Sequence, residues 1–116
     1  MVYFEAAHTL KARYVDVHTK IQSEQIHGHT YHCSISVEGE PDKDGMVKDF
    51  GHFKYAIDAI KLLLDHKFLD TVEDLNRPTM ENICLYIAKK LNSFKGLSEV
   101  IVERKASGDK CTLEVK

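Results

Sequence analysis

Two histidines separated by one glycine, His27-Gly28-His29, are the residues of this chain with the clearest capacity for chemistry. Residues two apart on a strand point to the same face, so the two imidazoles would lie side by side. Such a pair can bind a divalent metal ion, and a third histidine would leave one coordination position open for water or substrate. His8 is the candidate third ligand. The spacing therefore predicts a metal site, although an H-x-H pair also arises by chance in a chain with seven histidines.

Two carboxylates close to histidines are candidates for proton transfer. Asp65 directly precedes His66 at the predicted end of a helix, and a carboxylate can orient an imidazole that acts as general acid or base. The pair can cooperate only if the chain leaves the helix there, because adjacent helical residues point in different directions. A histidine at a helix C-terminus is also favoured by the helix dipole alone. Glu24 precedes His27 by three residues and is either a base near the metal or a solvated loop residue.

Two further glutamates are candidates for binding a ligand. Glu103 ends the apolar run Val100-Ile101-Val102, and a buried carboxylate needs partners, such as the N–H donors of a ligand. A strand position that faces solvent is the alternative. Glu81 falls in the first turn of a predicted helix, where the helix dipole favours negative charge in any case.

The composition predicts a single domain over residues 1–116 and excludes several classes of protein. A net charge of −2 gives no reason to expect a nucleic acid or an anionic membrane as partner. The sequence shows no apolar run of membrane-spanning length and no signal-peptide pattern, so we expect a cytoplasmic protein. The three cysteines form no C-x-x-C pair, and Cys33 and Cys84 fall on apolar faces, which is typical of small buried residues.

Hydrophobic periodicity predicts the order strand, strand, helix, helix, strand, strand. Strands are expected at residues 2–7 and 30–39, helices after the caps Asp49 and Thr79, and a hairpin over residues 99–105 and 111–115. The fold class is therefore α+β, a four-stranded antiparallel sheet with two helices on one face. The open edges of so small a sheet favour pairing with another subunit.

Six short motifs in this order resemble one known family. They are Phe4-x-Ala6-Ala7-His8, His27-Gly28-His29, Gly45-Met46-Val47-Lys48-Asp49-Phe50, Leu64-Asp65-His66, Pro78-Thr79-x-Glu81-Asn82 and Val100-x-Val102-Glu103. The chain resembles the 6-pyruvoyl tetrahydropterin synthase and 6-carboxytetrahydropterin synthase family over residues 3 to about 104.

The resemblance implies a fold, an assembly and a set of site residues. It implies the tunnelling fold, with sheets joined edge to edge into the barrel of a homohexamer, a dimer of trimers with active sites between subunits. It implies that His8, His27 and His29 bind zinc and that Asp65 and His66 form a proton-transfer pair working with a cysteine base. It also implies that Glu103 anchors the pterin ring of a small-molecule substrate, with Thr79 and Glu81 nearby.

The chain departs from the cysteine-bearing members of that family at the position of the base. Ser23 stands where they have cysteine, and the next residue is Glu24. This is similar to the subgroup with the motif Glu-x-x-His-Gly-His, in which glutamate replaces cysteine. A carboxylate is a competent base near neutral pH, whereas a serine hydroxyl is far too weak an acid. A second departure is Arg104, where many relatives have threonine; contact with phosphate and simple exposure are its two interpretations.

The resemblance with Glu24 as base predicts a zinc-dependent lyase that acts on the side chain of 7,8-dihydroneopterin or its triphosphate. The expected reaction is retro-aldol cleavage to 6-hydroxymethyl-7,8-dihydropterin, which feeds folate-type biosynthesis. Synthesis of 6-pyruvoyl tetrahydropterin or 6-carboxy-5,6,7,8-tetrahydropterin is the alternative within the family. A non-catalytic protein that binds zinc or pterin is the alternative from another class.

Overall fold

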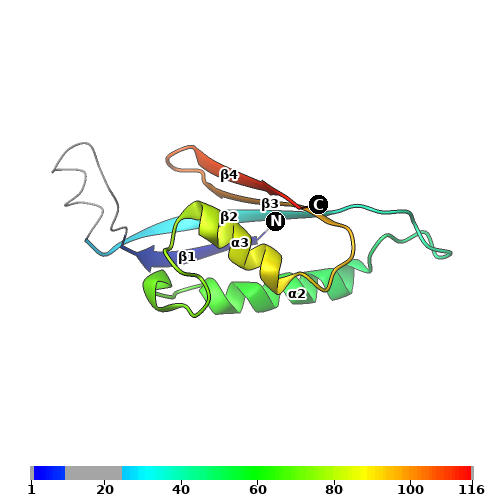
Figure 1. Cartoon of the computed structure of the whole chain (residues 1–116), viewed down its shortest axis with the longest axis horizontal. Coiled ribbons are helices and arrows are strands. Elements are labelled where there is room, and N and C mark those ends of the chain that lie inside the picture. Colours follow the sequence, from blue (N-terminus) through cyan, green and yellow to red (C-terminus); the bar gives the residue numbers. More distant parts are fainter. Residues whose placement is uncertain (1, 10–24, 116) are drawn as a thin grey trace.

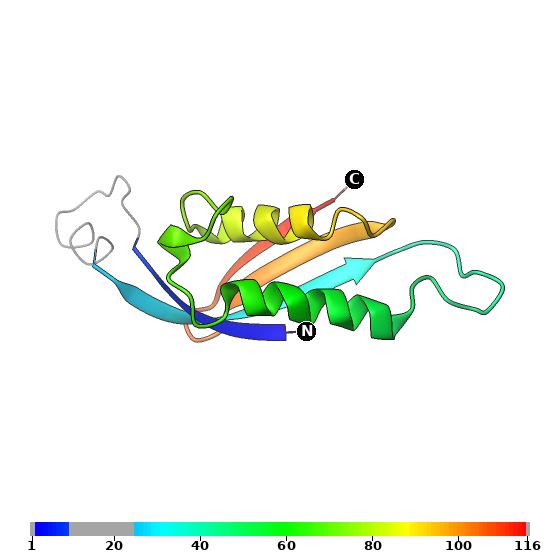
Figure 2. The ribbon, with the colours of Figure 1, turned by 90° about the horizontal axis from the view of Figure 1, so that it is seen from below.

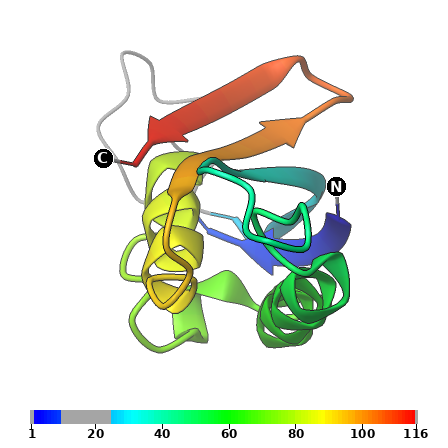
Figure 3. The same ribbon diagram turned by 90° about the vertical axis from the view of Figure 1, so that its right-hand side faces the viewer.

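The computed structural model describes residues 2–9 and 25–115, and the elements follow the predicted order. Four antiparallel strands form one sheet in the order β1-β2-β3-β4, with bounds β1 (Val2–His8), β2 (His27–Val37), β3 (Leu97–Arg104) and β4 (Asp109–Glu114). The other elements of the described residues are the helices α2 (Phe50–Leu64) and α3 (Met80–Lys90) and the short 3-10 helix η1 (Leu69–Thr71). Figures 1 and 3 show both longer helices on the same side of the curved sheet, which confirms the predicted fold class.

The alternation of side chains along β2 and β3 separates a helix-covered face from an open face. Tyr31, Cys33 and Val102 are buried under the helices. His32 and Glu103, which are paired in register, lie between those positions and therefore point to the open face. β2 begins at His27 rather than at residue 30, because His27 and Gly28 continue the pairing with His8 and Ala7 of β1.

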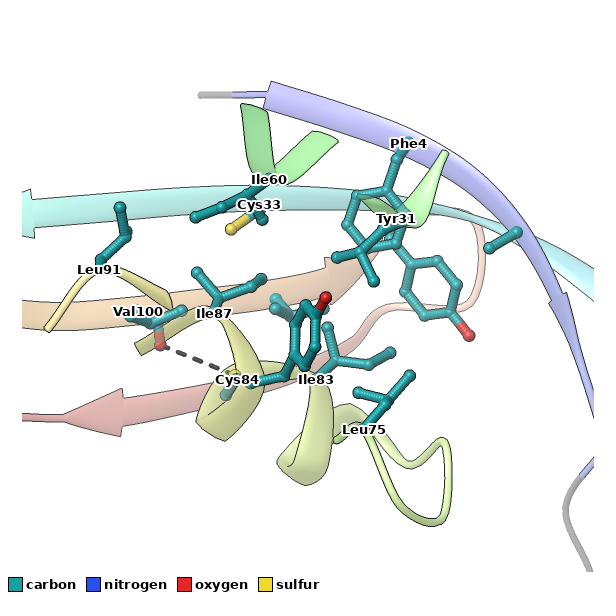
Figure 4. Packing of buried hydrophobic residues seen from close by; sticks show 14 of the residues in the cluster. Phe4, Tyr31, Cys33, Ile60, Leu75, Ile83, Cys84, Ile87, Leu91 and Val100 are labelled. Atoms are coloured by element: carbon teal, nitrogen blue, oxygen red, sulfur yellow. Dashed lines mark hydrogen bonds between the residues drawn. The ribbon is translucent and has the colours of Figure 1, made fainter. Parts of the chain in front are cut away.

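The core lies between the helix-covered face of the sheet and the inner faces of α2 and α3. Phe4 and Tyr31 stack with ring centroids 5.1 Å apart, and Ile83 and Ile87 of α3 pack toward the sheet beside them (Figure 4). The predicted caps form as expected. Asp49 accepts a hydrogen bond from Gly51 N–H at 2.8 Å and Thr79 accepts one from Asn82 N–H at 3.1 Å. Among the described residues, no helix has the length and apolar character needed to cross a membrane.

The segment that follows α2 runs along the outer edge of β1 (Figure 2). The N–H of His66 donates to the carbonyl of Glu5 at 2.6 Å, and the N–H of Ala7 donates to the carbonyl of Lys67 at 3.0 Å. A parallel bridge joins Ala7 to Phe68. These contacts satisfy backbone groups at an otherwise open sheet edge. They also hold Asp65 and His66 beside the strand that ends in His8.

Candidate active site

The three predicted metal ligands come together at the ends of β1 and β2. Register pairs His8 with His27 and Ala6 with His29, so all three imidazoles lie on the helix-covered face. One ligand atom from each histidine lies within 4.8 Å of the other two. The ring centroid of His8 lies 4.5 Å from that of His27 and 5.0 Å from that of His29. Three nitrogens at this spacing can hold one metal ion and leave a coordination position open.

Backbone carbonyls set the tautomers of two of these histidines. Nδ1 of His8 donates to the carbonyl of Pro78 at 3.0 Å, and Nδ1 of His27 donates to the carbonyl of Gln25 at 2.8 Å. A carbonyl only accepts, so the lone pair of each ring lies on Nε2. Nε2 of His8 is buried and has no hydrogen-bond partner among the described residues. A buried, unpaired acceptor in a cluster of histidines fits a metal ligand, and carbonyl contacts of this kind orient such ligands.

Burial keeps these imidazoles in the neutral form that binds metals. Burial lowers the pKa of His8, and it is a larger effect than the carbonyl of Pro78, which raises it. Burial, followed by the positive charge of Arg104, lowers the pKa of His29 to about 4. Both rings are therefore neutral near pH 7, and no proton has to leave them before a metal binds.

Arg104 reaches the same cluster from the end of β3. Its Nη1 donates to Nε2 of His29 at 2.9 Å, and its Nη2 forms an ion pair with Asp109. The hydroxyl of Ser107 also donates to Asp109, at 2.8 Å. Neither interpretation of Arg104 from the sequence included a contact with a metal ligand. The alternation of side chains along the strand could have predicted this contact, because Arg104 lies on the same face as the buried Val102.

Asp65 and His66 lie where the chain leaves α2, which is the condition for their cooperation. Asp65 is the C-cap, with extended dihedrals (φ −69°, ψ 132°), and His66 has a φ of 59°. Nε2 of His66 lies 3.7 Å from Oδ1 of Asp65, which also accepts the N–H of Glu5 at 2.9 Å. Asp65 is thus held in place, whereas the His66 side chain is 77% exposed.

A cleft lies between His66 and the neighbouring part of β1 and β2. It has a volume of about 650 Å³, and its lining includes His66, Phe68, Gly28, Thr30 and His29. Gly28 and Thr30 alternate with the histidines along β2, so this cleft lies on the open face of the sheet and includes only His29 of the cluster in its lining. A small molecule can enter it beside His66.

The candidate substrate-binding residues occupy two different places. Thr79 follows Pro78, whose carbonyl orients His8, and Glu81 is exposed in the first turn of α3. Glu103 lies on the open face of the sheet, opposite His32 in register. The structure therefore places Thr79 near the histidine cluster and Glu103 on the other face of the same sheet. Glu24, the candidate base, lies outside the described residues, as does Ser23.

Known proteins with the same sequence pattern and fold support this architecture. The family model described as 6-pyruvoyl tetrahydropterin synthase matches residues 1–114. The dihydroneopterin monophosphate aldolase of Pyrococcus furiosus is 38% identical over 88 residues, which cover 76% of this chain and 68% of that protein. The 6-carboxy-5,6,7,8-tetrahydropterin synthase of Synechocystis is 34% identical over 94 residues, covering 76% of this chain and 68% of that protein.

A solved structure extends the similarity to the whole fold. The 6-pyruvoyl tetrahydropterin synthase of Caenorhabditis elegans superposes with a TM-score of 0.80 at 25% identity, covering 99% of this chain and 91% of that one. The order of elements and the match over nearly the entire sequence lead to one conclusion. The chain belongs to the 6-pyruvoyl tetrahydropterin synthase family.

Proposed function

We propose that this protein is a zinc-dependent lyase that cleaves the side chain of 7,8-dihydroneopterin or a phosphorylated form of it. The product would be 6-hydroxymethyl-7,8-dihydropterin, released together with a two-carbon aldehyde. The observation that carries the proposal is the cluster of His8, His27 and His29, with a buried and unpaired Nε2 on His8. The aldolase name of the Pyrococcus furiosus relative supports the choice of reaction.

A zinc ion held by the three histidines would act as a Lewis acid that polarises a side-chain oxygen of the substrate. Glu24 would take the proton of the second side-chain hydroxyl, and the bond between the first and second side-chain carbons would break. The electron pair of that bond stays with the first carbon, which must then gain a proton. His66, whose Nε2 lies 3.7 Å from Oδ1 of Asp65, would deliver it.

The position of Glu103 supports an active site shared between copies of the chain. A pterin held by Glu103 of the same copy would sit on the open face, while the histidine cluster lies on the helix-covered face. Glu103 of a second copy could instead lie beside the histidine cluster of the first, so that one pterin contacts both. The homohexamer implied by the family resemblance would supply such a copy. Within the described ranges, no strand pairs with the outer edge of β4, where a second sheet could add.

Synthesis of 6-carboxy-5,6,7,8-tetrahydropterin is the second candidate function, because the Synechocystis relative carries that name. The family resemblance implies a cysteine base for this reaction and for 6-pyruvoyl tetrahydropterin synthesis in the cysteine-bearing members. Ser23 stands at that position in this chain. Of the described cysteines, Cys33 and Cys84 are buried and Cys111 is partly buried against the core. The absence of cysteine at position 23 favours the aldolase reaction.

Product identification by mass spectrometry tests the proposal. The zinc-loaded protein is incubated separately with 7,8-dihydroneopterin, its monophosphate and its triphosphate, and we expect the hydroxymethyl product. Glu24→Gln and His66→Asn should each lower kcat by about 100-fold or more, since general acid–base groups contribute on that scale. Asparagine tolerates the positive φ of His66, so this change removes the imidazole without straining the backbone.

Matched controls separate loss of the group from general damage. Glu73→Gln and His52→Asn make the same changes at exposed positions outside the site and should leave kcat unchanged. A pyruvoyl or carboxy product would replace the aldolase reaction with the second candidate function. Bound zinc without turnover of any of the three substrates would favour a binding protein instead.

A further inference from the structure

The contact between Arg104 and His29 occupies an atom that a metal ligand needs. Nη1 of Arg104 lies 2.9 Å from Nε2 of His29. A guanidinium is always protonated in proteins and only donates hydrogen bonds, so Nε2 of His29 must accept with its lone pair. A neutral imidazole has a single nitrogen with a free lone pair. The lone pair of His29 is therefore already engaged.

Neither ring nitrogen of His29 can bind a metal while this hydrogen bond persists. A metal on Nε2 would take the lone pair and displace the guanidinium. A metal on Nδ1 would leave the proton on Nε2, where it would face the N–H of Arg104, and two donors cannot form a hydrogen bond. The other two ligands differ, since carbonyls accept from Nδ1 of His8 and of His27 and leave each Nε2 available.

The position of Arg104 is fixed by its other contacts. Its Nη2 forms an ion pair with Asp109, which also accepts the hydroxyl of Ser107. The Arg104 side chain is only 24% exposed, and its Nε is buried without a hydrogen-bond partner among the described residues. A partly buried guanidinium with two partners is a specific contact rather than a passing surface approach.

We propose that Arg104 competes with the metal for His29, so that metal binding and the Arg104–His29 hydrogen bond exclude each other. Arg104 then sets the metal affinity of the site without being a ligand. Loading the metal breaks its contact with His29 and leaves the ion pair with Asp109 in place. The inference rests on the metal site of the proposed function and assigns a role to a residue outside the three ligands.

Zinc affinity of two matched variants tests this competition. Arg104→Met removes the guanidinium and keeps the length of the side chain, whereas Lys110→Met removes one positive charge from the exposed, open-face side of the same hairpin. Dissociation constants are measured on metal-free protein by competition with a chromophoric chelator. We expect Arg104→Met to bind zinc about tenfold more tightly than the unmodified chain, the scale of one lost hydrogen bond to a charged group. Lys110→Met should change little.

The tautomer of His29 gives a second readout that does not depend on a variant. In metal-free protein, ¹⁵N-detected imidazole correlations should show His29 with its proton on Nδ1 and an acceptor at Nε2. Addition of zinc should abolish that signature and shift the Arg104 guanidinium resonances. A proton on Nε2 of His29 in the metal-free protein would overturn the inference.

The outcomes separate this inference from the proposed function. Equal affinity in Arg104→Met and the unmodified chain, or equal tightening in both variants, would overturn the role of Arg104 and leave the metal site intact. Zinc binding by Arg104→Met alone would support the competition strongly. Failure of all three proteins to bind zinc would overturn the metal site itself, and the competition with it.

Discussion

Burial controls the chemistry of single side chains in this protein in two opposite directions. It lowers the pKa of His29 to about 4, which favours a neutral metal ligand. It raises the pKa of Cys33 to about 12 and that of Tyr31 to about 12, which keeps both groups protonated. Burial disfavours the charged form of each group, which is the imidazolium of His29 and the thiolate of Cys33. His29 is therefore neutral and able to bind a metal, whereas Cys33 stays an unreactive thiol.

The buried thiol of Cys33 should make the folded protein less stable at high pH. Its pKa is raised from 9.0 to about 12 in the folded protein, so the unfolded chain releases the proton first as the pH rises. The stabilisation is therefore fully present below pH 9 and is lost progressively toward pH 12. Urea denaturation at several values between about pH 8 and 10.5 should show a steeper loss of unfolding free energy for the unmodified chain than for Cys33→Ala.

The experiment compares the slopes of the unfolding free energy against pH. A constant difference between the two proteins is expected in any case, because Cys33→Ala leaves a small cavity at every pH. Parallel curves for the two proteins would show that the Cys33 thiol does not contribute to the pH dependence.

Helix ends, more than helix centres, position the candidate site. α2 stops because Asp65 takes an extended conformation, and the chain then runs along β1, with His66 N–H on the carbonyl of Glu5. α3 starts at the cap Thr79, directly after Pro78, whose carbonyl orients His8. Each of these helix ends satisfies backbone hydrogen-bonding groups and also fixes the position of a site side chain, His66 after α2 and His8 beside the start of α3.

Two helix caps provide a matched comparison between a structural and a functional role. Thr79→Ala and Asp49→Ala each remove a capping acceptor and should each lower the free energy of unfolding by about 1 kcal/mol. Only Thr79→Ala should also raise KM, because Thr79 lies beside the residue that orients His8, whereas Asp49 caps the other helix. Stability comes from urea denaturation and KM from steady-state kinetics.

Thr79→Ser retains the hydroxyl and should preserve both the stability and the KM. An unchanged KM in Thr79→Ala would limit Thr79 to its capping role.

At the scale of the whole molecule, the sheet itself separates the two halves of the proposed site. The histidine cluster lies on the helix-covered face and Glu103 on the open face, and no rotamer of Glu103 can cross the backbone layer between them. If both bind one substrate, they must come from different copies, as in many symmetric oligomers whose sites lie at interfaces.

Mixing two inactive variants tests this shared site. His27→Ala and Glu103→Ala are each expected to have very low activity, and the two are unfolded, mixed and refolded together. Random assembly should restore about a quarter of the activity per site, because half of the copies carry each intact group. Light scattering on the same sample checks that an oligomer forms. Refolding each variant alone is the control, and a mixture as inactive as its components would place both groups of each site on one copy.

Local patterns in the sequence were sufficient for the elements and for part of the site. Periodicity predicted both helices, Asp49 and Thr79 predicted their first residues, and the single glycine between His27 and His29 predicted two imidazoles on one face. The strand ends were less well predicted, since β2 starts at His27 and not at residue 30. Pairing with β1, which no local pattern encodes, extends the strand through both histidines.

The sequence by itself determined which residues share a helix or strand face, because such relations depend on the repeat of the backbone within one element. Only the tertiary structure decided that Arg104 contacts His29 and that Glu103 faces away from the metal ligands. Both relations join β2 to β3, which the two helices separate in the chain, and they depend on strand register. A shift of that register by one residue would reverse the face of Glu103 relative to the histidines, and only the packing of the complete core prevents it.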